Sequence, residues 1–152
     1  MHEFSQSLLV GQKGERVFAE HARSCGRQVS PATSDDQRKG IDCYVQSASG
    51  DWVTVEVKTD EAATRTGNVF VEIVSNASRG VLGWAYTSQA QWLAFVIGET
   101  ITVLSASAVR QRVGQWAVQY PLRSVQNREG HSVGVLVPRE NVERLGVSYD
   151  KA

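Results

Sequence analysis

KGIDCYVQSASGDWVTVEVK, residues 39–58, contains two segments in which apolar and polar residues alternate. The apolar positions are 41, 43 and 45 in the first segment and 53, 55 and 57 in the second. Alternation with a period of two predicts β-strands that bury one face. The connection Ala48-Ser49-Gly50 has glycine at its third position, which suits a type I turn followed by a left-handed residue. This segment is therefore predicted to form a β-hairpin.

Asp42, Glu56 and Lys58 are predicted to lie on one side of this hairpin. With the loop at residues 48–50, Ser47 pairs with Asp51, and counting along both strands places Asp42 opposite Glu56. Directly paired residues of antiparallel strands share a face, with β-carbons roughly 5 Å apart. Lys58 follows two residues after Glu56 and lies on the same face. The opposite side of the ribbon carries Ile, Cys and Val.

This arrangement of charges predicts a divalent-metal site. Two neighbouring carboxylates repel each other unless a cation lies between them. Their hard oxygen atoms favour Mg²⁺ or Mn²⁺ over zinc or copper. A metal held by Asp42 and Glu56 can polarise a phosphoryl oxygen and lower the pKa of a bound water, while Lys58 steadies the attacking water. A Glu-x-Lys pattern alone usually marks a solvated sheet face, so the interpretation depends on Asp42 at the facing position.

These residues resemble the PD-(D/E)XK nuclease superfamily. The similar features are an acidic residue at a strand start in Lys39-Gly40-Ile41-Asp42, a variable hairpin, and Val55-Glu56-Val57-Lys58. The earlier stretch Gly11-Gln12-Lys13-Gly14-Glu15-Arg16 is similar to the N-terminal helix of that family, which often carries a glutamate facing the site. The resemblance covers roughly residues 8–97. Ile41 stands where the family name has proline, and the resemblance does not extend to the C-terminal third.

The resemblance implies a role for each candidate residue. Asp42 and Glu56 would be metal ligands together with the Val57 backbone carbonyl, Lys58 would be the catalytic lysine, and Glu15 would be an accessory acid. Glu15 lies almost in line with the apolar stripe of its helix, so it either reaches the sheet face or stays at the boundary with water.

Glu72 is a further candidate. It is a charge inside an otherwise apolar strand, in a Gly-Asn-x-Phe-x-Glu stretch at residues 67–72 that is similar to sequences in the family. Because charges are seldom buried without a partner, a supporting role beside the metal is favoured over an edge-strand position.

The rest of the chain predicts an α/β fold, with a mixed β-sheet flanked by helices around a restriction-endonuclease-like core. A helix is expected from residue 6 to about residue 25, followed by a polar loop at 31–40. Strands are expected at 69–75, 92–97, 100–104 and 133–137, and the first of these should extend the hairpin into a three-stranded meander. A helix capped by Ser105 or Ser107 and a short helix from Pro138 to Gly146 complete a single domain over residues 1–152.

The charge balance requires any nucleic-acid partner to bind a local patch. Sixteen basic residues balance sixteen acidic ones, so no global cationic field attracts phosphates. Arg38, Lys39 and Arg65 flank the expected site and are candidate nucleic-acid-binding residues. Scattered surface arginines are the alternative interpretation of the same residues.

The cysteines and the N-terminus predict a cytoplasmic protein with no membrane segment. Cys25 and Cys43 belong to no paired-cysteine motif, so a zinc site on them is not expected. The N-terminus has no signal-peptide pattern, and no apolar run reaches the ~20 residues of a membrane helix. The aromatic residue Trp92 is expected in the core, whereas Trp84 is left open between core and base stacking.

The sequence thus predicts a Mg²⁺- or Mn²⁺-dependent endodeoxyribonuclease that acts on DNA rather than RNA. The resemblance extends to structure-specific Holliday-junction resolvases, which need a homodimer to cut two strands symmetrically. One alternative is a catalytically inactive nuclease fold that binds nucleic acid or protein. Another is a metal-assisted hydrolase of small phosphates.

Overall fold

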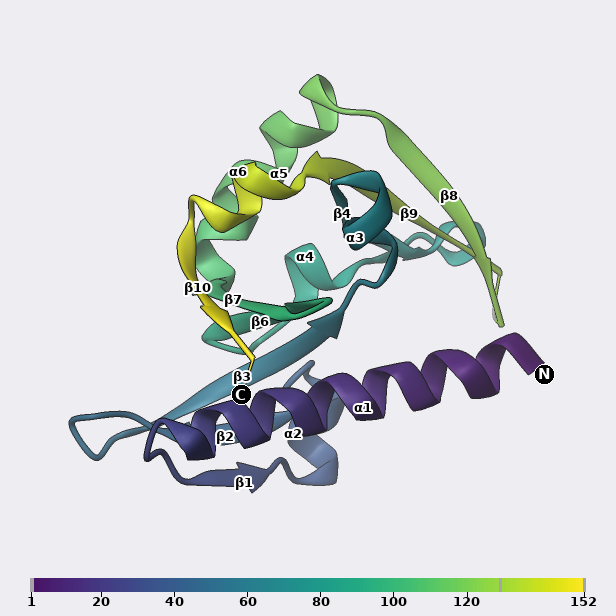
Figure 1. Ribbon diagram of the computed structural model, residues 1–152. Coiled ribbons are helices and arrows are strands. Elements are labelled where there is room, and N and C mark those ends of the chain that lie inside the picture. Colours follow the sequence, from purple (N-terminus) through teal and green to yellow (C-terminus); the bar gives the residue numbers. More distant parts are fainter. Residues whose placement is uncertain (1, 129, 152) are drawn as a thin grey trace.

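The computed structural model describes residues 2–128 and 130–151, with side chains from residue 8 onward (Figure 1). The helices are α1 (His2–Ser24), α2 (Ser34–Arg38), α3 (Ala62–Thr66), α4 (Trp84–Thr87), α5 (Ala106–Gln119) and α6 (Arg139–Glu143), with a 3-10 turn η1 (Ala77–Arg79). The strands are β1 (Val29–Pro31), β2 (Cys43–Gln46), β3 (Trp52–Thr59), β4 (Asn68–Asn76), β5 (Val81–Leu82), β6 (Trp92–Ile97), β7 (Thr100–Ser105), β8 (Leu122–Asn127), β9 (Gly130–Pro138) and β10 (Gly146–Asp150).

The strands form two sheets. The first has six strands in the order β1-β2-β3-β6-β7-β10, and the second has four strands in the order β5-β4-β9-β8. In the first sheet β3 and β6 are parallel, whereas its other neighbours are antiparallel. This is the mixed sheet with flanking helices that the sequence predicts, so the α/β fold class is confirmed.

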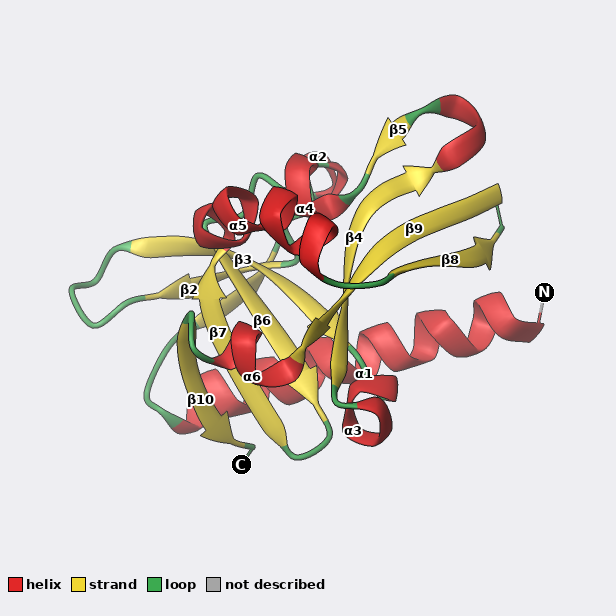
Figure 2. Cartoon of the chain, turned by 90° about the horizontal axis from the view of Figure 1, so that it is seen from above, coloured by secondary structure: helices red, strands yellow, loops and turns green. Residues whose placement is uncertain are grey.

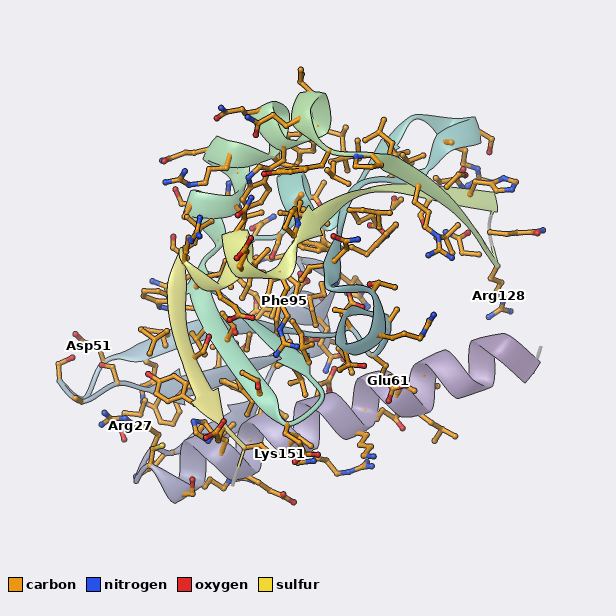
Figure 3. The ribbon with its side chains drawn as sticks, turned by 45° about the horizontal axis from the view of Figure 1, so that its top comes forward. Arg27, Asp51, Glu61, Phe95, Arg128 and Lys151 are labelled. Atoms are coloured by element: carbon orange, nitrogen blue, oxygen red, sulfur yellow. The ribbon has the colours of Figure 1, made fainter. Side chains whose placement is uncertain are left out.

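The β2–β3 hairpin has the predicted register. Gln46 pairs with Trp52 and Cys43 pairs with Val55, and the Ser47 N–H donates to the Asp51 carbonyl at 2.7 Å. Gly50 closes the turn with φ of 92°, a left-handed conformation that glycine adopts at little cost. Figure 3 shows Asp51 at the tip of this hairpin, far from the interior.

The predicted three-stranded meander is wrong. The strand expected at 69–75 is present as β4, but it belongs to the second sheet, and β6 takes the place beside β3. The chain leaves β3 at Asp60, whose carboxylate accepts the Ala63 N–H at 3.0 Å and the Phe70 N–H at 2.9 Å. These bonds start α3 and fix the beginning of β4, so the chain turns away before it can pair with β3. Parallel strands need a long crossover, and residues 60–91 supply it.

Helix α1 covers one face of the first sheet. Its buried Phe18 and Ala22 pack with Val55, Val57 and neighbouring apolar residues of β2, β6 and β7. The helix approaches β3 closely, because a β-carbon on Gly14 would lie 1.8 Å from Thr59 Oγ1. The expected N-terminal helix is therefore confirmed, and it starts earlier than predicted.

The other face of the first sheet packs against α5, β4 and β9. Phe95 lies in this interior and is 1% exposed (Figure 3). Helix α5 buries Val109, Val113 and Trp116, which recur at helical spacing. The predicted Ser105 cap is present, because its hydroxyl accepts the Ala108 N–H at 3.3 Å. The expected strands at 92–97, 100–104 and 133–137 are confirmed as β6, β7 and β9.

Two expectations at the ends of elements need correction. Residues 31–40 are not all loop, because Thr33 caps α2 by accepting the Asp36 N–H at 3.2 Å. Gly146 does not merely end the short helix after Pro138 but begins β10, beside β7. A β-carbon there would lie 2.1 Å from the Val103 carbonyl oxygen, so only glycine allows this close pairing. Within residues 2–128 and 130–151, no helix has the length and apolar character needed to cross a bilayer.

Candidate active site

The site forms where β2 begins and leaves part of β3 without a strand neighbour. The Asp42 N–H donates to the Val55 carbonyl at 2.8 Å, and Asp42 Oδ2 accepts the Val57 N–H at 2.7 Å. The Asp42 carboxylate thus accepts a hydrogen bond from β3 that a backbone carbonyl would accept if β2 extended further alongside it. Ile41 leaves the hairpin pattern and packs with Ala32 and Ala90.

Asp42 consequently lies at the edge of β3, in line with the sheet, and not on its face as predicted. The irregular pairing at Asp42 is the cause, because its side chain turns toward the backbone of Val57. A strand residue directs its N–H and its C=O to the same side. The Val57 carbonyl therefore faces the same edge as Asp42.

Glu56 and Lys58 share a face of β3, as the sequence predicts. This face also carries Leu93 and Phe95, their partners on β6, and it is opposite to the face covered by α1. Lys58 Nζ lies 3.5 Å from Glu56 Oε2 and 5.0 Å from the centre of the Trp84 ring. The Lys58 amine thus lies between a carboxylate and the face of an aromatic ring.

The Glu56 carboxylate is buried and incompletely paired. The residue is 5% exposed, and its Oε1 atom has no hydrogen-bond partner among the described residues. The pKa of Glu56 is raised to about 7, mainly by burial and also by the negative charge of Asp42, while the charge of Lys58 and hydrogen bonds from Ser88 and Lys58 limit the rise. Near neutral pH this carboxyl is therefore divided between its protonated and ionised forms.

Helix α1 brings Glu15 to the other side of Asp42. The two carboxyl groups lie within hydrogen-bonding reach, although Glu15 as a whole residue is exposed. Burial and the charge of Asp42 raise the pKa of Glu15, and burial also raises the pKa of Asp42 against the Val57 N–H and Lys58. Both interpretations of Glu15 from the sequence hold in part, because its carboxyl lies beside Asp42 while the residue remains exposed at the boundary with water.

Gly40 and Ser88 complete the surroundings of Glu56, and the sequence interpretation missed both as site residues. Gly40 has φ of 85°, and a β-carbon there would lie 3.1 Å from Glu56 Oε2 and 3.2 Å from Ser88 Oγ. The Lys-Gly-Ile-Asp stretch does contain a signal for Gly40, because glycine beside a functional residue often marks a close approach. Ser88 gave no signal, since it lies in an uncharged loop far along the chain.

Glu72 contacts the site through Trp84. Its Oε1 accepts the backbone N–H of Trp84, the first residue of α4, at 3.3 Å. Burial raises the pKa of this half-buried carboxyl, while Lys58 and the Trp84 N–H oppose the rise. Glu72 therefore holds the tryptophan whose ring faces Lys58, and Trp84 belongs to the surroundings of the site as well as to the core.

The predicted phosphate-binding residues are placed unevenly. Arg38 pairs with Asp35 at 2.6 Å and Lys39 pairs with Asp36 at 3.6 Å, all within the region of α2. The Lys39 carbonyl accepts the Gln89 N–H at 2.9 Å, which places Lys39 beside the loop of Ser88. Arg65 is exposed on α3, beyond the end of β3, and no described ion pair or hydrogen bond joins it to the carboxylates.

The donor atoms fit a hard divalent cation with mixed ligands. Within the described part of the chain, no three His, Cys, Asp or Glu side chains gather as a metal-binding group. Asp42 and the Val57 carbonyl nevertheless face the same edge of β3, and Glu56, whose pKa the charge of Asp42 raises, has an Oε1 atom without a hydrogen-bond donor among the described residues. Oxygen ligands of this kind suit Mg²⁺ or Mn²⁺, which keep several waters.

The comparisons with known proteins bear on the fold. No protein-family model matches the chain, and no curated protein matches it. Among solved structures, the bacterial homing endonuclease I-Ssp6803I is similar, with a TM-score of 0.52 and 17% sequence identity. The similarity covers 68% of this chain and 71% of the endonuclease chain. The chain therefore has a mixed α/β fold similar to that of a homing endonuclease.

Proposed function

We propose that this protein is a metal-dependent endodeoxyribonuclease of the PD-(D/E)XK type. The observation that carries the proposal is a buried carboxylate oxygen of Glu56 without a partner among the described residues, beside Asp42 and Lys58. A purely structural carboxylate would be satisfied by protein donors. The similar fold of a homing endonuclease supports the proposal.

Asp42, Glu56 and the Val57 carbonyl would hold the metal. A bound Mg²⁺ or Mn²⁺ would act as a Lewis acid toward a phosphoryl oxygen and acidify a nearby water. Binding requires the ionised form of Glu56, so the cation competes with the proton that burial favours. Glu15, whose pKa is raised by burial and by the charge of Asp42, would help to orient the neighbouring Asp42 carboxyl toward the Val57 N–H.

Lys58 supplies the positive charge of the site. Its side chain is 29% exposed, so the amine can meet both Glu56 and a substrate phosphate. There it would orient the attacking water or stabilise the charge that develops on the phosphoryl oxygens. Glu72 and Trp84 would keep the amine in this position.

The site suits a polymer better than a small phosphate. Neither of two pockets of about 260 and 230 Å³ in the described structure is lined by Asp42, Glu56 or Lys58. Enzymes for small molecules usually enclose most of the ligand surface. A site at the edge of a strand leaves room for a nucleic-acid backbone to pass.

A catalytically inactive nuclease fold is the second candidate. The observation that favours it is that no three His, Cys, Asp or Glu side chains among the described residues are arranged to hold a metal ion, although Glu15 lies beside Asp42. In that case the protein would bind nucleic acid or another protein without hydrolysis.

The decisive experiment is a nuclease panel with wild type, Lys58→Ala and Lys151→Ala in Mn²⁺ buffer. The substrates are supercoiled plasmid, linear duplex, single-stranded DNA, RNA and a four-way junction. Lys151 is a matched control, because it pairs with Glu99 at 3.2 Å outside the site. We expect cleavage of DNA that falls at least about a hundredfold in Lys58→Ala and stays unchanged in Lys151→Ala.

The same panel, together with Mn²⁺ titration calorimetry of the wild type, separates the alternatives. Metal binding without cleavage of any nucleic acid would favour a small-phosphate hydrolase, and no metal binding would favour the inactive module. Preference for the four-way junction would support a structure-specific enzyme, and light scattering would then test the homodimer that symmetric cutting requires.

A further inference from the structure

The charges of this neutral chain are unevenly distributed along the sequence. Between Ile73 and Arg128 the only acidic residue is Glu99, which pairs with Lys151 at 3.2 Å. The same stretch contains five arginines, at positions 79, 110, 112, 123 and 128. This part of the chain is therefore basic, and it can attract phosphates although the whole chain does not.

Arg110 connects this basic stretch to the site. It lies on α5, which packs beside α4 (Figure 2). Its Nη1 atom donates to the Ser88 carbonyl at 3.0 Å, and the Ser88 hydroxyl hydrogen-bonds the Glu56 carboxylate. Arg110 is thus separated from a proposed metal ligand by a single residue.

The guanidinium of Arg110 has donors to spare. An arginine carries five N–H donors in a planar fork. One donor binds Ser88, and none of the described ion pairs includes Arg110, although the residue is exposed. By contrast, Arg38 and Arg139 are each paired with a carboxylate at 2.6 and 2.7 Å. A fork that is anchored at one nitrogen and open elsewhere suits a phosphate oxygen pair.

The loop around Ser88 offers further groups of the same kind. Gln89 is exposed and its N–H binds the Lys39 carbonyl at 2.9 Å, so Lys39 lies on the side of the loop away from Arg110. Tyr86 on α4 is 41% exposed. Together the exposed residues Tyr86, Gln89 and Arg110 at this loop form what we call the loop surface.

We propose that the loop surface binds the phosphate backbone of DNA beside the bond that is cut, with Arg110 as its main phosphate ligand. This inference rests on the proposed nuclease function. Arg110 would hold a phosphate group and so fix the position of the DNA strand on the protein. Because Ser88 hydrogen-bonds both Arg110 and Glu56, the strand would be positioned relative to the Glu56 carboxylate.

The test is fluorescence anisotropy with a labelled duplex, in Ca²⁺ to prevent cleavage, for wild type, Arg110→Ala, Arg110→Gln and Arg112→Ala. Arg112 is the matched control, because it is exposed on the same helix and makes no described contact with the loop. We expect Arg110→Ala to weaken binding about five- to tenfold and to lower the slope of log affinity against log salt by about one. Arg112→Ala should change affinity less than about twofold.

Arg110→Gln removes the charge but keeps a donor for the Ser88 carbonyl, so it guards against misfolding of the loop. It should lose affinity as Arg110→Ala does while its melting temperature stays that of wild type. Wild-type affinity in Arg110→Gln, or equal losses in the variants at 110 and 112, would overturn the inference and leave the proposed nuclease standing. Failure of wild type to bind or cut any nucleic acid would instead overturn the proposed function.

Discussion

Two acidic residues, one within a strand and one directly after it, behave in opposite ways. Asp60, which follows β3, has both carboxylate oxygens occupied by backbone N–H groups, from Ala63 at 3.0 Å and Phe70 at 2.9 Å. Glu56, four residues earlier, is more deeply buried, yet its Oε1 atom has no partner in the described structure. The Asp60 carboxylate therefore stabilises the turn from β3 into β4, whereas one oxygen of the Glu56 carboxylate has no hydrogen-bond donor in the described structure.

This difference distinguishes a structural acid from a candidate functional one. Buried polar atoms are nearly always hydrogen-bonded, because an unmet group costs about 1–3 kcal/mol. The protein tolerates this cost at Glu56, beside Lys58 and Asp42, and avoids it at Asp60. A bound cation would supply what the protein leaves out at Glu56.

The largest expected effect separates two aspartates that each accept a backbone N–H near β3. Asp42→Asn should lower DNA cleavage at least about a hundredfold, since an amide is a poor ligand for a hard cation. Asp60→Asn keeps an acceptor and lies outside the metal site, so its cleavage rate should stay within about threefold of wild type. Titration calorimetry with Mn²⁺ checks the cause, because only Asp42→Asn should lose the binding heat.

Glu56→Gln should stabilise the metal-free protein at high pH. The folded-state pKa of about 7 lies above the ordinary value of 4.5, so the folded protein binds more protons than the unfolded chain between these values. Stability therefore falls as pH rises through this window, by about 3 kcal/mol for this group alone. Urea unfolding should show Glu56→Gln more stable than wild type at pH 8 and equal to it near pH 4.5.

Added Mg²⁺ should reverse this ranking at pH 8. Only wild type offers the ionised carboxylate that binds the cation, so only wild type should gain stability. A Gln variant that is less stable than wild type in metal-free buffer at pH 8 would show that Glu56 is a satisfied structural residue like Asp60.

Asp60→Ala tests the structural side of the comparison. The Ala63 and Phe70 N–H groups would lose their acceptor, with an expected loss of about 2 kcal/mol in the free energy of unfolding. The remaining folded protein should bind Mn²⁺ as wild type does. A loss of metal binding without a loss of stability would place Asp60 in the site instead of at the turn into β4.

The sequence predicts the parts of this site that depend on local patterns. Period-two alternation and the glycine turn predicted the register of the hairpin from Gln46–Trp52 to Cys43–Val55, and helical spacing allowed Glu15 to reach the site, where it lies beside Asp42. The sequence did not predict where β4 pairs, because two apolar strands of similar composition compete for the same edge of β3. The hydrogen bonds of Asp60 turn the chain away from β3, and β4 pairs with β9 instead; a single carboxylate leaves no periodic signal in the sequence.

Other missing site residues have the same explanation. Ser88 and Trp84 reach Glu56 and Lys58 through the crossover between β3 and β6, so their contacts depend on tertiary structure. Arg110 contacts the site through the backbone carbonyl of Ser88, and a contact with a backbone atom leaves no pattern in the sequence. The in-plane position of Asp42 was missed because the break in pairing at the start of β2 replaces a backbone partner with a side chain.

The smallest expected effect compares two glycines with similar backbone angles. Gly40 and Gly50 have φ of 85° and 92°, so alanine at either position should cost about 1 kcal/mol of stability. A methyl group on Gly40 would lie 3.1 Å from Glu56 Oε2 and 3.2 Å from Ser88 Oγ, whereas Gly50 has open space around it. Gly40→Ala should therefore also weaken Mn²⁺ binding several-fold, and Gly50→Ala should not. Equal metal affinity in both variants, measured by calorimetry, would show that metal binding at Glu56 does not depend on the close approach of Gly40. The difference between Glu56 and Asp60 would then rest on the deeper burial of Glu56 alone.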